Sequence, residues 1–145
     1  MTAFTDWMES AILALLFNAT AIANIADNAA SSPITNWYVA LHTASAGEAG
    51  SDQSTNEASY GSYARVAVAR TSGGFTIASG VLTFVSNVVF PTPTSGAGAS
   101  LTHASIGIAA SGATNFAFHG ALSAPITVAV GVPPEIQAAS QIALD

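Results

Sequence analysis

The sequence predicts an all-β sandwich with a single helix at its N-terminus. Short segments that alternate apolar and polar residues recur along most of the chain, separated by Gly, Ser and Pro turns. About eight such segments follow one another at roughly the 8–12-residue spacing typical of sandwiches and barrels. No helical segment alternates with them, which disfavours a parallel α/β fold. We expect one domain over residues 1–145, with a helix at 5–20, a linker at 21–35 and the sandwich at 36–145.

The helix is predicted from apolar residues that recur at three- and four-residue spacing over residues 5–20. Thr5 or Asp6 can cap it, and Asp6 followed by Glu9 resembles a capping box. Further apolar residues flank the stripe, and a helix that is apolar nearly all round is buried on more than one side. The second side is either more of the core or a neighbouring subunit. The stripe consists of Phe4, Met8, Ile12, Leu15, Leu16 and Ala19.

Two alternating segments at 37–43 and 63–70 bracket a polar loop at 44–59. In the first segment, Val39 and Leu41 share one face, as a half-buried strand requires. Loops longer than about 12–15 residues are usually functional or disordered. Carboxylates in this loop could bind calcium, but their spacing matches no EF-hand pattern, so we expect a solvated surface loop. The carboxylates are Glu48, Asp52 and Glu57.

The remaining strands are shorter and are separated by turns. Gly73 and Gly74 provide the backbone freedom that a hairpin turn needs. Residues 91–100 contain no apolar side chain larger than Ala or Pro and are therefore predicted to form a loop. The predicted strands are 74–78, 81–84, 87–90, 101–109, 115–122, 125–130 and 136–144.

Few side chains of this chain carry a charge. Only 7% of the residues are charged, against roughly 25% in ordinary soluble domains, and the mean hydropathy is +0.49. A freely diffusing monomer usually keeps a charged surface for solubility. We therefore expect a subunit of an assembly, with a small secreted or thermally tolerant domain as the alternative.

The charge balance also excludes some partners. The net charge is −6, with two Arg and no Lys, whereas a nucleic-acid binder needs cations to replace the counterions of the phosphate backbone. The longest apolar run, 11–17, is far shorter than the ~20 residues that span a bilayer. The acidic residues before it are unlike the positive start of a signal peptide. We therefore expect no nucleic acid, no membrane span and no signal peptide. The absence of cysteine excludes disulfides and Cys-based zinc sites.

The candidates for chemistry are histidines, serines and carboxylates. By alternation, His42, His103 and His119 point towards solvent or an interface, and no pair of them has the spacing of a zinc site. The sequence has no Gly-x-Ser-x-Gly elbow and no Gly-rich phosphate loop. No carboxylate lies in the middle of a predicted strand, where a glycosidase pair would be held rigidly. We therefore expect no enzyme, no catalytic residue, no metal and no cofactor.

Arg65 and Arg70 are the only permanent cations among the side chains. In so cation-poor a chain, we expect each to have a fixed partner, in this subunit or in the next. Arg65 lies beside Tyr63, on the face opposite Val66 and Val68. Its planar guanidinium is therefore expected to stack on a ring or to pair bidentately with a carboxylate.

Several motifs spread over nearly the whole chain match one known group. The most specific is Tyr38-Val-Ala-Leu-His-Thr-Ala with Gly47-Glu-Ala-Gly50, and the weaker Tyr60 and Tyr63-Ala-Arg-Val-Ala follow it. Individually weaker ones are Phe4-Thr-Asp, Phe90-Pro-Thr, Leu101-Thr-His103, Ile106-Gly107, Phe118-x-Gly-Ala-Leu122 and Leu144-Asp145. In these motifs the chain resembles a family of small virion proteins of tailed phages. Its members are usually labelled tail fibre proteins, while some resemble head cement (decoration) proteins with a jelly-roll-like sandwich. The chain departs from the family pattern at 20–33, where an Ala/Asn-rich stretch lengthens the link between helix and first strand.

The resemblance implies a structural protein of the virion. We favour a capsid cement protein on the outer surface of the head, because fibre proteins are normally long, repetitive and trimeric and this sequence has no repeat. Its partners would be the major capsid protein and copies of itself, as a dimer or trimer. The alternative is a small tail fibre or tail tip component that binds a receptor or glycan through exposed tyrosines, Tyr60 and Tyr63. The predicted capsid or intersubunit contacts are Phe4, Trp7, Ile12, Leu16, Glu48, Asp52, Tyr60, Tyr63, Arg65 and Arg70.

Overall fold

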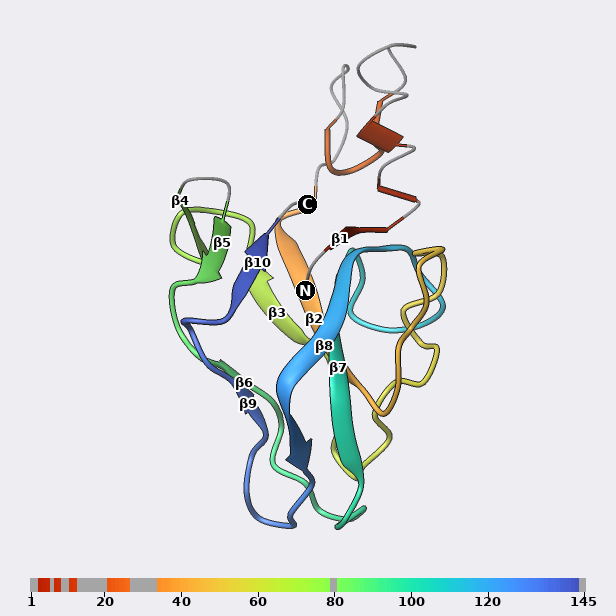
Figure 1. Ribbon diagram of the computed structural model, residues 1–145, viewed down its shortest axis with the longest axis vertical. Helices are drawn as coiled ribbons and strands as arrows, with labels where there is room; N and C mark the ends of the chain where they lie inside the picture. The colour runs from red at the N-terminus through yellow and green to blue at the C-terminus, as the bar shows by residue number, and fades with distance from the viewer. Residues whose placement is uncertain are drawn as a thin grey trace.

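Antiparallel strands make up almost all of the regular structure, so the all-β prediction is confirmed (Figure 1). The computed structural model describes residues 3–5, 7–8, 11–12, 21–26, 34–78 and 81–143. Within these residues every strand pairs with antiparallel neighbours. The strands are β1 (Ala3–Phe4), β2 (Asn36–His42), β3 (Val66–Ala69), β4 (Phe75–Ala78), β5 (Val81–Phe84), β6 (Val88–Val89), β7 (Ser100–Gly107), β8 (Phe116–Thr127), β9 (Glu135–Ile136) and β10 (Gln141–Ala143).

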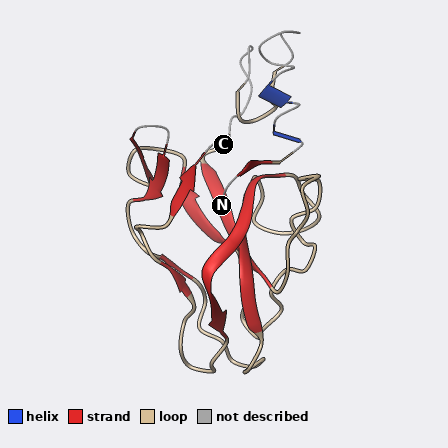
Figure 2. Cartoon of the chain, in the orientation of Figure 1, coloured by secondary structure: helices blue, strands red, loops and turns tan. Residues whose placement is uncertain are grey.

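The strands form one large sheet and two small ones (Figure 2). The five-stranded sheet has the order β1-β8-β7-β2-β3, and the smaller sheets have the orders β10-β5-β4 and β6-β9. β2 and β7 are neighbours although β3 to β6 separate them in the chain, and Leu41 lies opposite Ala104. This crossover joins the first and second halves of the sequence in a single sheet.

The apolar core combines residues of the large sheet with residues of both small sheets. Val39 and Leu41 are fully buried, as their alternation predicts. They belong to the same cluster as Phe84 of β5, Ile142 of β10 and Ile136 of β9. Burying a side chain of the size of Leu stabilises a fold by about 1.5–3 kcal/mol, so this cluster holds the sheets together.

The predicted helix at 5–20 is not borne out as one continuous element. Among the described residues, helical backbone occurs at 7–8 and 11–12, whereas 6, 9–10 and 13–20 lie outside them. Thr5 nevertheless caps this segment as predicted, because the Met8 N–H donates to Thr5 Oγ1 at 3.3 Å. No helix of the described residues is long and apolar enough to cross a membrane.

Pairing with β8 explains why the start of this segment is not helical. Phe4, which the helical stripe includes, lies instead in β1 opposite Phe118, with ring centroids 5.3 Å apart. Thr5 is fully buried, and its Oγ1 donates to the Phe116 carbonyl at 3.0 Å. The Thr5 N–H donates to the Ala117 carbonyl at 3.3 Å. These contacts fix the segment to the edge of the large sheet, which periodicity alone could not indicate.

Two predicted strands, 115–122 and 125–130, are largely one strand, β8. The register with β7 shifts along it, so that only Thr102 lies opposite residues 122–125. The chain bulges there, and Pro125, which has no N–H for the ladder, lies in the bulge. Conversely, the predicted strand at 136–144 is divided into β9 and β10 by a turn.

Candidate functional site

Most residues of the loop at 44–59 are exposed, as predicted for a surface loop, but part of the loop packs onto the large sheet, which was not predicted. Gln53 is fully buried, and its N–H donates to the Thr114 carbonyl at 2.9 Å. Its side-chain Nε2 donates to the Tyr38 carbonyl of β2 at 3.0 Å. At the end of the loop, the Ala58 N–H donates to the Leu41 carbonyl at 2.8 Å. The loop therefore covers the face of the sheet opposite the apolar core.

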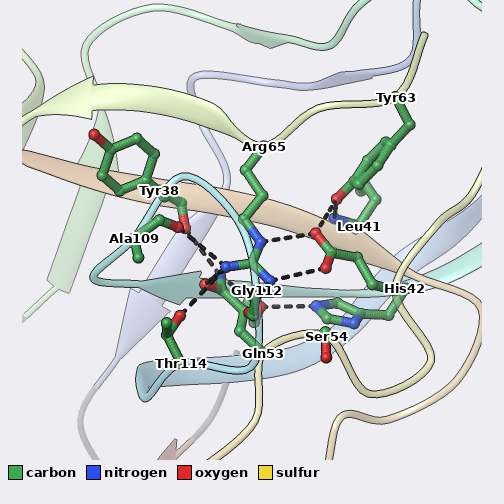
Figure 3. Close-up of polar contacts among 12 residues, drawn as sticks. Tyr38, Leu41, His42, Gln53, Ser54, Tyr63, Arg65, Ala109, Gly112 and Thr114 are labelled. Carbon is green, nitrogen blue, oxygen red and sulfur yellow. Dashed lines mark hydrogen bonds and ion pairs between the residues drawn. The ribbon is translucent and has the colours of Figure 1, made fainter.

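Arg65 lies at the centre of this covered face (Figure 3). Arg65 is only 7% exposed, and its Nε and Nη2 donate to the two carboxylate oxygens of Glu57, each at 2.8 Å. Of the two predicted arrangements, stacking on a ring or bidentate pairing with a carboxylate, the pairing is the one found, and the partner lies in the same chain. Nη1 also donates to Gln53 Oε1 at 2.9 Å and to the Ala109 carbonyl at 3.0 Å, and Nη2 donates to the Gly112 carbonyl at 2.8 Å.

These bonds use all five N–H groups of the guanidinium. Taking a cation and a carboxylate out of water costs several kcal/mol per ion, which only good geometry and complete hydrogen bonding offset. Arg65 meets that condition by linking β3, the loop at 44–59 and the turn at 109–114. The network therefore fixes the conformation of both loops.

His42 and Ser105 form a second part of the network. His42 Nε2 lies 2.7 Å from Ser105 Oγ, and its Nδ1 lies 3.0 Å from the Thr55 carbonyl. Because a carbonyl only accepts, Nδ1 carries the proton and Nε2 accepts from the serine hydroxyl. Gln53 Nε2 donates to the same Ser105 Oγ at 3.1 Å. This is the arrangement of a serine nucleophile and its base, yet both side chains are 0% exposed.

Burial determines what this pair can do. It lowers the pKa of His42, so the ring is held neutral as a hydrogen-bonding link between β2, β7 and the loop. The prediction that His42 points towards solvent or an interface is wrong, because a loop of the same chain covers that face of β2. Ser105 was not identified from the sequence, since its strand position predicts only that it shares a face with His103.

Tyr60 and Tyr63 support the same loop from inside the sandwich. Tyr60 is 5% exposed and donates to the Pro91 carbonyl at 3.1 Å, and burial raises its pKa to about 12. The Tyr63 hydroxyl donates to Glu57 Oε1 at 3.0 Å and accepts from the Leu41 N–H at 3.1 Å. Burial raises the pKa of Tyr63 as well. The receptor-binding alternative requires exposed tyrosine rings, and neither of these two rings is exposed.

The other predicted contact residues occupy different surroundings. Glu48 is exposed and bonds His119 Nε2 at 2.8 Å, whereas Asp52 accepts two hydrogen bonds from Ser54, which lower its pKa. Phe4, Trp7 and Ile12 are half-buried, and Leu16 lies outside the described residues. Within the described ranges, no group of three or more His, Asp or Glu could hold a metal ion.

Arg70 also has fixed partners, and among the described residues these are carbonyls rather than carboxylates. It donates to the main-chain carbonyls of Asn24 and Ile34 at 3.5 and 3.4 Å, and to that of Ile25. The contact ties the turn at 21–26, within the predicted linker, to the end of β3. Residues 27–33 of that linker lie outside the described part of the chain.

Comparison with known protein families identifies a family that matches this chain. The family model described as "Podophage GP4 fiber I protein gp80" matches residues 3–144. The chain belongs to this family. It is therefore a structural virion protein of a tailed phage, as the sequence motifs predicted. No curated protein matches the chain.

Proposed function

We propose that this virion protein is a cement, or decoration, protein bound to the outer surface of the phage head. The observation that carries the proposal is that both arginine side chains bond groups of the same chain. Arg65 is enclosed with Glu57, and Arg70 bonds main-chain carbonyls, so no described side chain presents an unpaired permanent cation. A surface of neutral polar groups with a few carboxylates suits close packing on a protein lattice.

The buried network supports the same proposal through preorganisation. A loop that is already ordered loses less conformational entropy on binding, so more of its contact energy appears as affinity. Glu48 and Asp52 stand on the loop that Gln53 and Arg65 hold in place. We propose that they contact the capsid together with the N-terminal residues Phe4, Trp7, Ile12 and Leu16.

The stabilising mechanism would be mass action. A protein that binds only the assembled lattice lowers its free energy relative to dissociated subunits, by about 2.7 kcal/mol per site at a concentration of 100 times Kd. The major capsid protein and further copies of this chain are the proposed partners. The chain is proposed to lack enzymatic activity, since Ser105 and His42 are enclosed.

A second candidate function is a tail fibre component. Its support is the description of the matching family as a fibre protein. It would require a receptor-binding surface other than Tyr60 and Tyr63, since Tyr60 is buried and Tyr63 is half-buried with its hydroxyl bonded inside the chain.

The two candidates differ in copy number. Quantitative mass spectrometry of purified virions would measure this chain against the major capsid protein. A cement protein is expected at a ratio near one, or at a simple fraction of it. A handful of copies per particle would refute the capsid role and favour the fibre component.

A further inference from the structure

A groove opens between the bulged part of β8 and the strands β9 and β10. Its volume is about 380 Å³, within the range of specific binding pockets. Phe84, Ile136 and Ile142, all buried, line it together with the half-buried Leu122 and Ile126. Its polar lining residues are Ser123, Glu135, Gln137, Ser140 and Gln141. The groove thus combines an apolar lining with a few polar groups, which is the composition of a recognition site.

Glu135 is the one charged residue of this groove. Gln137 Nε2 donates to its Oε1 at 2.7 Å, and Asn87 Nδ2 lies 3.4 Å from its Oε2. Two neutral amides therefore orient the carboxylate without neutralising it. No cation of the described residues pairs with it. An oriented carboxylate beside an apolar pocket is complementary to a cation carried on an aliphatic stem.

We propose that this groove receives a segment of a different protein, in which a lysine or arginine pairs with Glu135 and a neighbouring aliphatic side chain enters the apolar pocket. Naming that protein as the major capsid protein rests on the proposed function. The chemistry of the groove does not depend on that choice.

Charge complementarity argues against a second copy of this chain as the occupant. The sequence has no Lys, Arg65 is enclosed by Glu57, and Arg70 bonds the carbonyls of the turn at 21–26. A second copy could therefore offer Glu135 an arginine only by breaking one of these sets of bonds.

The bulge argues against simple strand addition at β8. A bulge and a proline are devices that prevent edge strands from pairing with other chains, and residues 122–125 carry both. The partner is therefore recognised by its side chains rather than by a continuous backbone ladder.

The first test compares Glu135→Gln with Glu135→Asp in the full chain, bound to virions that lack the protein. Both variants change the same side chain, but only Glu135→Gln removes the negative charge. We expect Glu135→Gln to weaken binding about tenfold, Glu135→Asp to weaken it less, and Ser123→Trp, which fills the groove from an exposed position, to abolish it. Equal binding of Glu135→Gln and the unmodified chain, or an equal loss in Glu135→Asp, would overturn the inference. Melting temperatures of all variants verify that they are folded.

The second test separates this inference from the proposed function. A photoreactive benzoylphenylalanine replaces Gln137 in the groove or, as the control, Val130, which is 56% exposed in a different turn. A crosslink from position 137 to a Lys- or Arg-containing segment of the major capsid protein supports both proposals. The same crosslink to a tail protein supports the groove and refutes the cement role. The groove proposal would be overturned if position 137 formed crosslinks only to another copy of the chain. It would also be overturned if bound protein formed crosslinks only from position 130, or none from position 137.

Discussion

Replacing Arg65 by Met removes the side chain that joins three segments of the sandwich. Methionine retains much of the aliphatic volume but leaves the Glu57 carboxylate without its counter-ion. The carbonyls of Ala109 and Gly112 lose a donor at the same time. Breaking a buried ion pair from one side costs about 3–5 kcal/mol. Because the Glu57 side chain is 15% exposed and that of Arg65 is 1% exposed, water can solvate part of the carboxylate, and we expect about 3 kcal/mol.

Urea unfolding of the purified chain, followed by tryptophan fluorescence, measures this loss. Arg70→Met is the matched control, because Arg70 is half-buried and, among the described residues, bonds carbonyls rather than a carboxylate, so its removal leaves none of their charges unpaired. It should cost about 1 kcal/mol. The double variant Arg65→Met/Glu57→Leu removes both charges and should be more stable than Arg65→Met alone.

The reasoning would be refuted by a loss of less than about 1 kcal/mol in Arg65→Met, the value of an exposed ion pair. A double variant less stable than Arg65→Met would also contradict it, because the penalty is assigned to the unpaired Glu57 carboxylate.

Two further predictions concern the same covered face of the sheet. Burial lowers the pKa of His42 below 6.5, so as the pH falls the unfolded chain binds a proton at this residue before the folded chain does. The free energy of unfolding should therefore decrease as the pH falls below 6.5, by at most about 1.4 kcal/mol per pH unit. Urea unfolding at about pH 7.5 and about pH 5.5 checks this, and an equal decrease in His42→Gln would exclude His42 as the cause. Gly107→Ala should lower the melting temperature, because the new Cβ would lie 2.1 Å from Gln53 Oε1 and displace the loop, at a cost of about 1–3 kcal/mol. The control Gly73→Ala, whose Cβ would meet only Thr71 Oγ1 at 3.4 Å, should stay within about 0.5 kcal/mol, and equal melting temperatures of the two variants would contradict the prediction.

The strands and the Arg65 pairing could be predicted because both follow from local rules. Alternation places Val39 and Leu41 inside, and burial confirms it. Because the chain has only two arginines and no lysine, a fixed partner for Arg65, either an aromatic ring or a carboxylate, could be predicted from composition and the planar geometry of guanidinium. That the partner is Glu57 could not be predicted, because the loop contains three carboxylates and the sequence does not distinguish between them as partners of Arg65.

The covered face could not be predicted because it depends on how a long loop folds back. Alternation gives the two faces of β2 but does not indicate that a loop of the same chain covers the second face, so it places His42 in solvent or at an interface. How closely the loop approaches the sheet depends on Gln53, whose side chain packs against Gly107, a position without a side chain. A glycine inside an alternating strand is a signal of close approach by another segment, and it could have indicated a packed loop.

The Arg65 network joins residues far apart in the chain, and this affects the rate at which the sandwich unfolds. Arg65 and the Gly112 carbonyl are 47 residues apart, so their bond closes a long loop, and the entropy cost of that closure disfavours the bond early in folding. Interactions absent from the folding transition state slow unfolding rather than speed folding. A virion outside its host cannot replace a damaged subunit, so its lifetime depends on that unfolding rate. The enclosed arginine would then set how long each copy persists on the particle.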